Sequence, residues 1–170
     1  LHEPYRRQRQ MCIRDSPLVV HAVVVLLPLA ALGAVVIAVQ RSWRRSLGIP
    51  VLLVALVGVA SVPMATTTGT QLYAALGGQN PVIDIHMQRA SLLLPVALAF
   101  LVLLGGGVLT ELAIVRAEVG AHAARAATET RYRVATGLSV LAALTGIAVV
   151  VIVVLVGHAG STAAWQGVVQ

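Results

Sequence analysis

The stretch "GLSVLAALTGIAVVVIVVLVG", residues 137–157, contains no charged side chain. At a rise of about 1.5 Å per residue, a helix of this length crosses a hydrocarbon core roughly 30 Å thick. Three further stretches are similarly apolar, at about 17–39, 48–66 and 90–115. We therefore predict an all-α fold, a polytopic membrane protein built as a bundle of four transmembrane helices.

The composition of the whole chain supports this prediction. Of the 170 residues, 58% are hydrophobic and 11% are charged, which is more apolar than a soluble domain of this length requires. The net charge of +6 would suit nucleic acid, but aromatic residues make up only 4% and lysine is absent. A basic surface interleaved with aromatic side chains is therefore not available, and we expect the lipid bilayer and not nucleic acid as the partner.

The first sixteen residues, "LHEPYRRQRQMCIRDS", differ from the remainder of the chain and lack apolar periodicity. The segment "RRQRQMCIRDS" resembles translated sequencing-adapter DNA, and the alternative is a genuine basic amphiphilic leader. We expect residues 1–16 to be a non-native or disordered leader and residues 17–170 to form the transmembrane domain. The only cysteine, Cys12, lies in this leader, so the chain offers no disulfide framework.

The arginines are distributed unevenly between the connections of the expected spans. Four of the 12 lie in residues 1–16, and seven of the other eight lie within 40–47 and 116–136. Because arginine-rich connections stay in the cytoplasm, we expect these two segments to be cytoplasmic. Residues 67–89 and the C-terminus would then be extracytoplasmic, in a multi-pass protein of the bacterial cytoplasmic membrane.

Three histidines lie near span ends that share the extracytoplasmic side. His21 lies one turn inside the first span, His86 lies just before the third, and His158 closes the fourth. A neutral imidazole in apolar surroundings needs partners for both nitrogens, so such a histidine marks a functional site or a hydrogen-bonded pair. Converging imidazoles can ligate a transition metal ion or the iron of haem b. The candidate cofactor-binding and metal-binding residues are therefore His21, His86 and His158.

Weaker signals lie elsewhere in the spans. Asp84 either orients a histidine ring or is a solvated loop acid. Glu111 lies one turn before the cytoplasmic end of the third span, and its carboxylate is expected to snorkel toward Arg116, with a proton path as the alternative. Gly33 and similar small residues would let helices approach closely. The motif "TTTG" at 66–69 is interpreted as a helix exit.

The sequence leaves two functions open. One is a membrane protein whose histidine cluster binds haem or a transition metal for electron transfer or redox sensing, with a membrane redox partner or a second copy of the chain. The other is a noncatalytic scaffold or accessory subunit whose histidines hydrogen-bond across helix ends. A small transporter is disfavoured because no charged residue lies near the centre of a span. No nucleophile and base pair or Walker motif is present, so we assign no enzymatic activity.

Three segments resemble the DUF2231 family of four-helix bacterial membrane proteins, in its actinobacterial form. They are "PLVVHAVVVLLPLAA" from residue 17, "PMATTTGTQL" with "DIHMQRASLL" from residues 63 and 84, and "GHAGSTAAWQGVV" from residue 157. The resemblance implies that His21, His86 and His158 occupy the histidine positions of the family. Ser16 stands where the family has a further histidine. The layout is also similar to that of membrane cytochromes that carry haem b.

Overall fold

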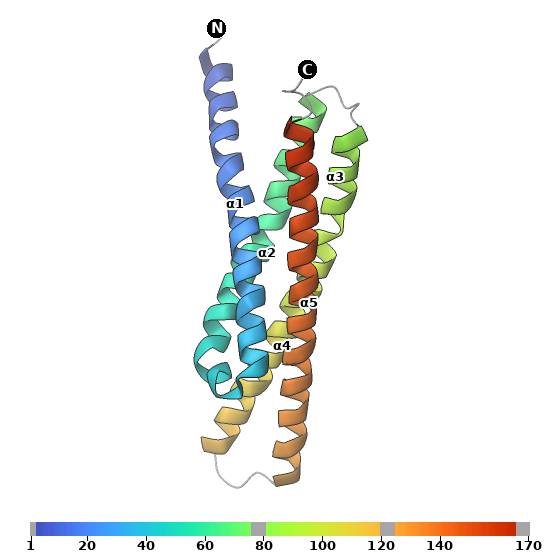
Figure 1. Ribbon diagram of the computed structural model, residues 1–170. Helices are drawn as coiled ribbons and strands as arrows, with labels where there is room; N and C mark the ends of the chain where they lie inside the picture. Colours follow the sequence, from blue (N-terminus) through green and yellow to red (C-terminus); the bar gives the residue numbers. More distant parts are fainter. Residues whose placement is uncertain (1–2, 76–80, 120–124, 166–170) are drawn as a thin grey trace.

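A computed structural model describes the backbone of residues 3–75, 81–119 and 125–165 and the side chains of residues 20–70, 84–116 and 129–161. Helix occupies almost all of this part of the chain (Figure 1). The elements are α1 (Glu3–Val39), the short 3-10 helix η1 (Arg41–Trp43), α2 (Arg44–Ala75), α3 (Pro81–Ser91), α4 (Leu93–Val119) and α5 (Arg125–Trp165). The prediction of an all-α fold is confirmed.

Four segments of the described chain are long and apolar enough to cross a membrane. They are Val20–Val39, Arg41–Thr70, Asp84–Arg116 and Glu129–Ser161. The number of spans therefore agrees with the prediction of a four-helix transmembrane bundle. The "TTTG" segment does not end its helix, because α2 continues to Ala75. The hydroxyls of Thr66, Thr67 and Thr68 instead donate to carbonyls three or four residues earlier in the same helix.

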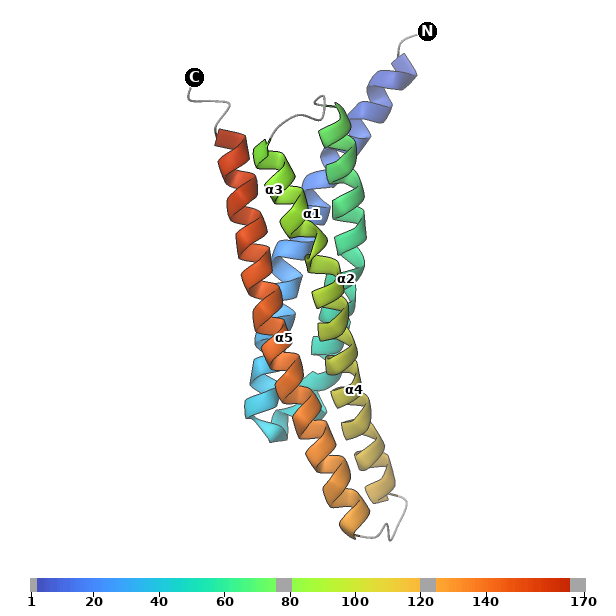
Figure 2. The same ribbon diagram turned by 90° about the vertical axis from the view of Figure 1, so that its right-hand side faces the viewer.

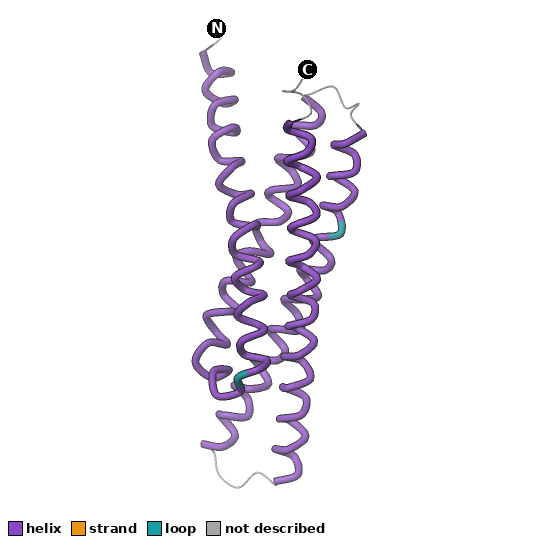
Figure 3. Tube along the Cα trace, in the orientation of Figure 1, coloured by secondary structure: helices purple, strands orange, loops and turns teal. Residues whose placement is uncertain are grey.

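The third span consists of two helices separated at Leu92, although its sequence is apolar throughout (Figure 3). Proline 95 has no N–H with which to donate to the carbonyl of Ser91, four residues earlier, and its ring crowds that carbonyl. The backbone forms a tighter turn at this point, because Leu92 N–H donates to the carbonyl oxygen of Arg89, three residues earlier, at 3.2 Å. The helix that we expected over 90–115 is therefore interrupted near its start, and His86 lies on a separate helix, α3.

The long helices form a ring in which each packs against two others (Figures 1 and 2). Helix α1 contacts α2 and α5, helix α4 contacts the same two helices from the other side, and α3 packs mainly on α5. The largest buried side chains come from all four spans: Leu27, Val62, Phe100, Leu104, Ile114 and Val149. These side chains fill the centre of the bundle and leave apolar residues such as Leu32, Val102 and Val154 exposed on the outside. An exposed apolar surface of this extent suits the hydrocarbon of a bilayer.

Glycines permit close contact between neighbouring helices. A Cβ atom added to Gly33 on α1 would lie 2.6 Å from Val51 Cγ2 on α2, which is too close for real atoms. A Cβ atom at Gly107 on α4 would lie 3.3 Å from Ser139 Oγ on α5. The expectation that Gly33 lets helices approach closely is therefore confirmed.

The N-terminal part of α1 extends beyond the other helices (Figure 2). Helix α1 begins at Glu3, so the backbone of residues 3–16 is helical and continuous with the first span. The side chains of residues 1–19, including Cys12, lie outside the described part of the structure, as does the side chain of Trp165.

Candidate functional site

His86 connects α3 to α5. Its Nδ1 atom lies 3.0 Å from the carbonyl oxygen of Val156, and the residue is half-buried. A carbonyl oxygen only accepts hydrogen bonds, so Nδ1 carries a proton and donates, and in the neutral ring Nε2 has a lone pair. Gly160 leaves space for the ring, because a Cβ atom there would lie 3.2 Å from His86 Cε1. The acceptor for Nδ1 is thus a backbone carbonyl of α5 and not the carboxylate of Asp84.

The other two candidate histidines lie at the same end of the bundle but are exposed. His21 lies on α1 near the start of the first span, and His158 lies on α5 near the end of the fourth. Within residues 20–70, 84–116 and 129–161, no group of three or more His, Cys, Asp or Glu residues could hold a metal ion. The described residues therefore do not show the expected three-histidine metal cluster, and the assignment of His21, His86 and His158 as metal or cofactor ligands stays a prediction.

A second polar site lies at the opposite end of the bundle, around Arg44. This residue is only 6% exposed. Its Nε and Nη2 atoms donate to Ile37 O and Ala38 O at 2.8 and 3.2 Å, and its Nη1 atom donates to Thr136 Oγ1 at 2.9 Å. The last carbonyls of a helix have no partner within it, so Arg44 caps the C-terminus of α1 while it links α2 to α5.

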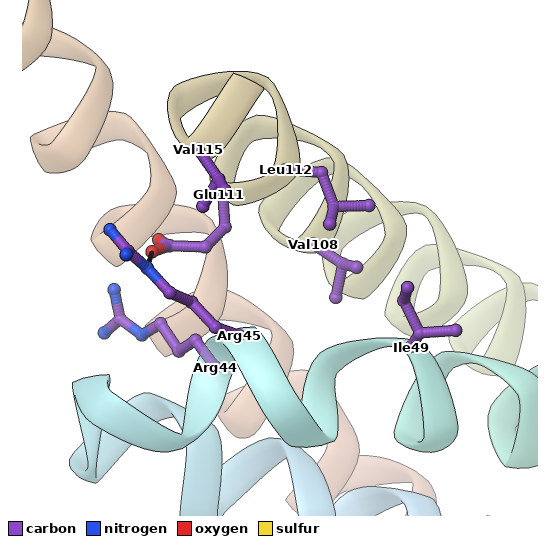
Figure 4. A pocket seen from close by; sticks show the side chains of 7 residues that line it. All are labelled: Arg44, Arg45, Ile49, Val108, Glu111, Leu112 and Val115. Carbon is purple, nitrogen blue, oxygen red and sulfur yellow. Dashed lines mark ion pairs between the residues drawn. The ribbon is translucent and has the colours of Figure 1, made fainter. Parts of the chain in front are cut away.

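Glu111 lies beside Arg44 and is 4% exposed. Its Oε1 atom is 3.6 Å from Arg45 Nε, and its charge also attracts Arg44 (Figure 4). The expectation that Glu111 snorkels toward Arg116 is wrong. The carboxylate lies on the face of α4 that packs against α2, whereas Arg116 is exposed. Within the described residues, Glu111 Oε2 is buried without a hydrogen-bond partner.

These charged residues border a pocket of about 90 Å³ between α2 and α4. It is lined by Arg44, Arg45, Ile49, Val108, Glu111, Leu112 and Val115, so its walls are aliphatic except at one end (Figure 4). Tyr132 of α5 joins two arginines next to this charged end. The guanidinium carbon of Arg41 lies 4.0 Å from the centre of its ring, and Arg45 Nη2 lies 3.3 Å from its hydroxyl.

Sequence reasoning treated Arg44 as a topology signal and did not single out Thr136. A signal was nevertheless present, since a carboxylate inside an apolar span requires a partner at the same depth. Arg44 and Arg45 lie near the start of the second span, and Glu111 lies near the end of the third. In a bundle of consecutive spans, these two ends are on the same side of the membrane. That pairing of opposite charges indicates the site, although not which arginine is buried.

The model of one protein family, described as "predicted membrane protein (DUF2231)", matches residues 17–170. The chain belongs to this family. The DUF2231 match includes the three histidines and the three charged residues of the pocket, Arg44, Arg45 and Glu111, and it begins directly after the unusual leader. No curated protein and no solved structure matches the chain. Together with the four candidate spans, membership of DUF2231 establishes a multi-pass membrane protein.

Proposed function

We propose that this DUF2231 protein is a noncatalytic scaffold or accessory subunit of the bacterial cytoplasmic membrane, whose histidines have structural roles. The observation that carries this proposal is the hydrogen bond from His86 Nδ1 to Val156 O. A half-buried imidazole that donates to a carbonyl of another helix stabilises the contact between the two helices. Gly160 lies opposite the ring, and because it has no side chain it leaves the space in which the imidazole of His86 packs.

A second function is supported by the same hydrogen bond. Histidines that ligate metals usually donate their other ring N–H to a carbonyl or carboxylate, which fixes the ring and leaves Nε2 as the ligand. His86, through Nε2, and His21 or His158 would then be the residues that hold haem b. Such a protein would serve electron transfer or redox sensing with a membrane partner.

The absorption spectrum and the stability of His86→Ala separate these functions. The scaffold proposal predicts no Soret band in protein purified from haem-replete cells. It also predicts that His86→Ala lowers the free energy of unfolding by about 1–2 kcal/mol, since a hydrogen bond and half-buried ring contacts are lost. A Soret band that disappears in His86→Ala would instead establish the haem function.

The orientation of the bundle is the second part of the proposal. Residues 40–47 and 116–136 hold seven arginines, which supports a cytoplasmic location for both segments. A reporter enzyme fused after Gln170 should therefore be active in its extracytoplasmic form, and one inserted near Gly120 should be active in its cytoplasmic form. The opposite pattern would place Arg44 and Glu111 outside the cell and would overturn the assigned orientation.

We also infer that residues 1–16 are a non-native leader. Two observations support this inference: the family match starts at Pro17, and the N-terminal part of α1 extends beyond the other helices.

A further inference from the structure

We propose that the pocket between α2 and α4 binds the headgroup of a phospholipid that carries a primary ammonium, such as phosphatidylethanolamine. The pocket has a volume of about 90 Å³ and includes a buried carboxylate, Glu111. Glu111 Oε2 has no hydrogen-bond partner within the described residues. This site lies at the other end of the bundle from His86, so the proposal does not depend on the function assigned above.

The carboxylate determines which chemical group fits the inner part of the pocket. A buried acceptor without a donor costs about 1–3 kcal/mol, and more when it is charged. An ammonium group has N–H donors and the complementary charge, so it removes this cost with a charge-assisted hydrogen bond. The pocket is small, about 90 Å³, so it suits a small group. An aminoethyl group has three heavy atoms, whereas a trimethylated ammonium is bulkier and has no N–H to donate.

The arginines next to the pocket provide the complement for a phosphate. The side chain of Arg45 is 51% exposed even though its Nε atom is 3.6 Å from Glu111 Oε1. Arg41 and Arg45 both contact Tyr132, which holds two guanidinium groups near each other beside the pocket. Arg44 is committed to Ile37, Ala38 and Thr136 and is not needed for this role. The exposed guanidinium groups of Arg41 and Arg45 therefore lie outside the carboxylate, where the outer phosphate of a zwitterionic headgroup requires positive charge.

The depth of the pocket also fits a lipid headgroup. It lies where α2 begins, next to η1, and the exposed Trp43 of η1 marks the same level of the bundle. Tryptophan and tyrosine prefer the boundary between headgroups and hydrocarbon. The remaining lining residues are Ile49, Val108, Leu112 and Val115, which suit the apolar part of a lipid. Basic pockets between transmembrane helices are known to hold anionic headgroups, and Glu111 adds selectivity for an ammonium.

Native mass spectrometry of the full chain in detergent tests the proposal with three lipids of equal acyl chains. Phosphatidylethanolamine should bind roughly tenfold more tightly than phosphatidylcholine, because the latter cannot donate a hydrogen bond to Glu111. Phosphatidylglycerol, which lacks the ammonium, should also bind more weakly. Glu111→Gln should remove the preference for phosphatidylethanolamine. The matched control is Glu129→Gln, an exposed carboxylate on α5 that pairs with Arg133, and it should retain the preference.

Measurements on the unchanged protein keep the proposal testable if Glu111→Gln does not fold. Stepwise N-methylation of phosphatidylethanolamine should weaken binding, with the largest loss when the last N–H disappears in phosphatidylcholine. Equal binding of the whole series would show that the pocket does not select an ammonium that carries N–H donors. Preferential binding of phosphatidylglycerol would show that the arginines act alone. A preference for phosphatidylethanolamine that survives in Glu111→Gln would place the ammonium elsewhere. Each of these three results would overturn the proposal.

Discussion

Replacing Arg44 with alanine is expected to lower the free energy of unfolding by about 3–5 kcal/mol, which is typical when one partner of a buried charged network is removed. Arg44 is 6% exposed and donates three hydrogen bonds, two to the last turn of α1 and one to Thr136. Its loss leaves the carbonyls of Ile37 and Ala38 without their donor. It also removes one of the two guanidinium groups that attract the buried Glu111. Unfolding in mixed micelles with increasing SDS measures the effect.

The control for this prediction is Arg133→Ala on α5. The side chain of Arg133 is 80% exposed and pairs only with the exposed Glu129 among the interactions described here, so its loss should change stability by less than about 0.5 kcal/mol. The double variant Arg44→Ala with Glu111→Gln should recover part of the loss, since it no longer buries an under-compensated charge. If Arg44→Ala unfolds at the same SDS fraction as Arg133→Ala, the buried network does not stabilise the bundle.

Gly33→Ala is expected to destabilise the bundle by about 1–3 kcal/mol, the range for an overpacked helix contact. The new methyl group would lie 2.6 and 2.9 Å from the two γ-carbons of Val51. Valine is branched at Cβ and has few rotamers, so the conflict is relieved mainly by separation of α1 and α2. The same SDS titration measures this loss.

Two further variants determine whether the cause is steric. Val51→Ala removes the atoms that the new methyl group meets, so the double variant Gly33→Ala with Val51→Ala should be more stable than Gly33→Ala alone. Gly157→Ala on α5 introduces a Cβ atom with nothing within 4 Å. It should be neutral or stabilising by up to about 1 kcal/mol, because alanine favours helix over glycine. Equal losses at Gly33 and Gly157 would show that close packing at Gly33 is not the reason.

The sequence by itself determined the number of spans and the class of fold. Insertion into a bilayer depends on the apolar character of successive residues, which is a local property of segments such as 137–157. The uneven distribution of arginines is equally local and predicts the orientation without any knowledge of packing. The close approach at Gly33 was also predictable, because small residues within transmembrane helices commonly lie where two helix backbones pack closely.

The tertiary structure decided how these helices are rotated about their axes, and therefore which side chains meet. Arg44 and Arg45 are adjacent and chemically identical, but successive residues of a helix point about 100° apart, so one is buried and the other is half-exposed. The same rotation directs Glu111 toward α2 and not toward Arg116. It turns His86 toward the Val156 carbonyl while His21 and His158 remain exposed. Sequence positions fixed the depth of each histidine along its span, but contact between helices depends on rotation, which residues far away in the chain determine through packing.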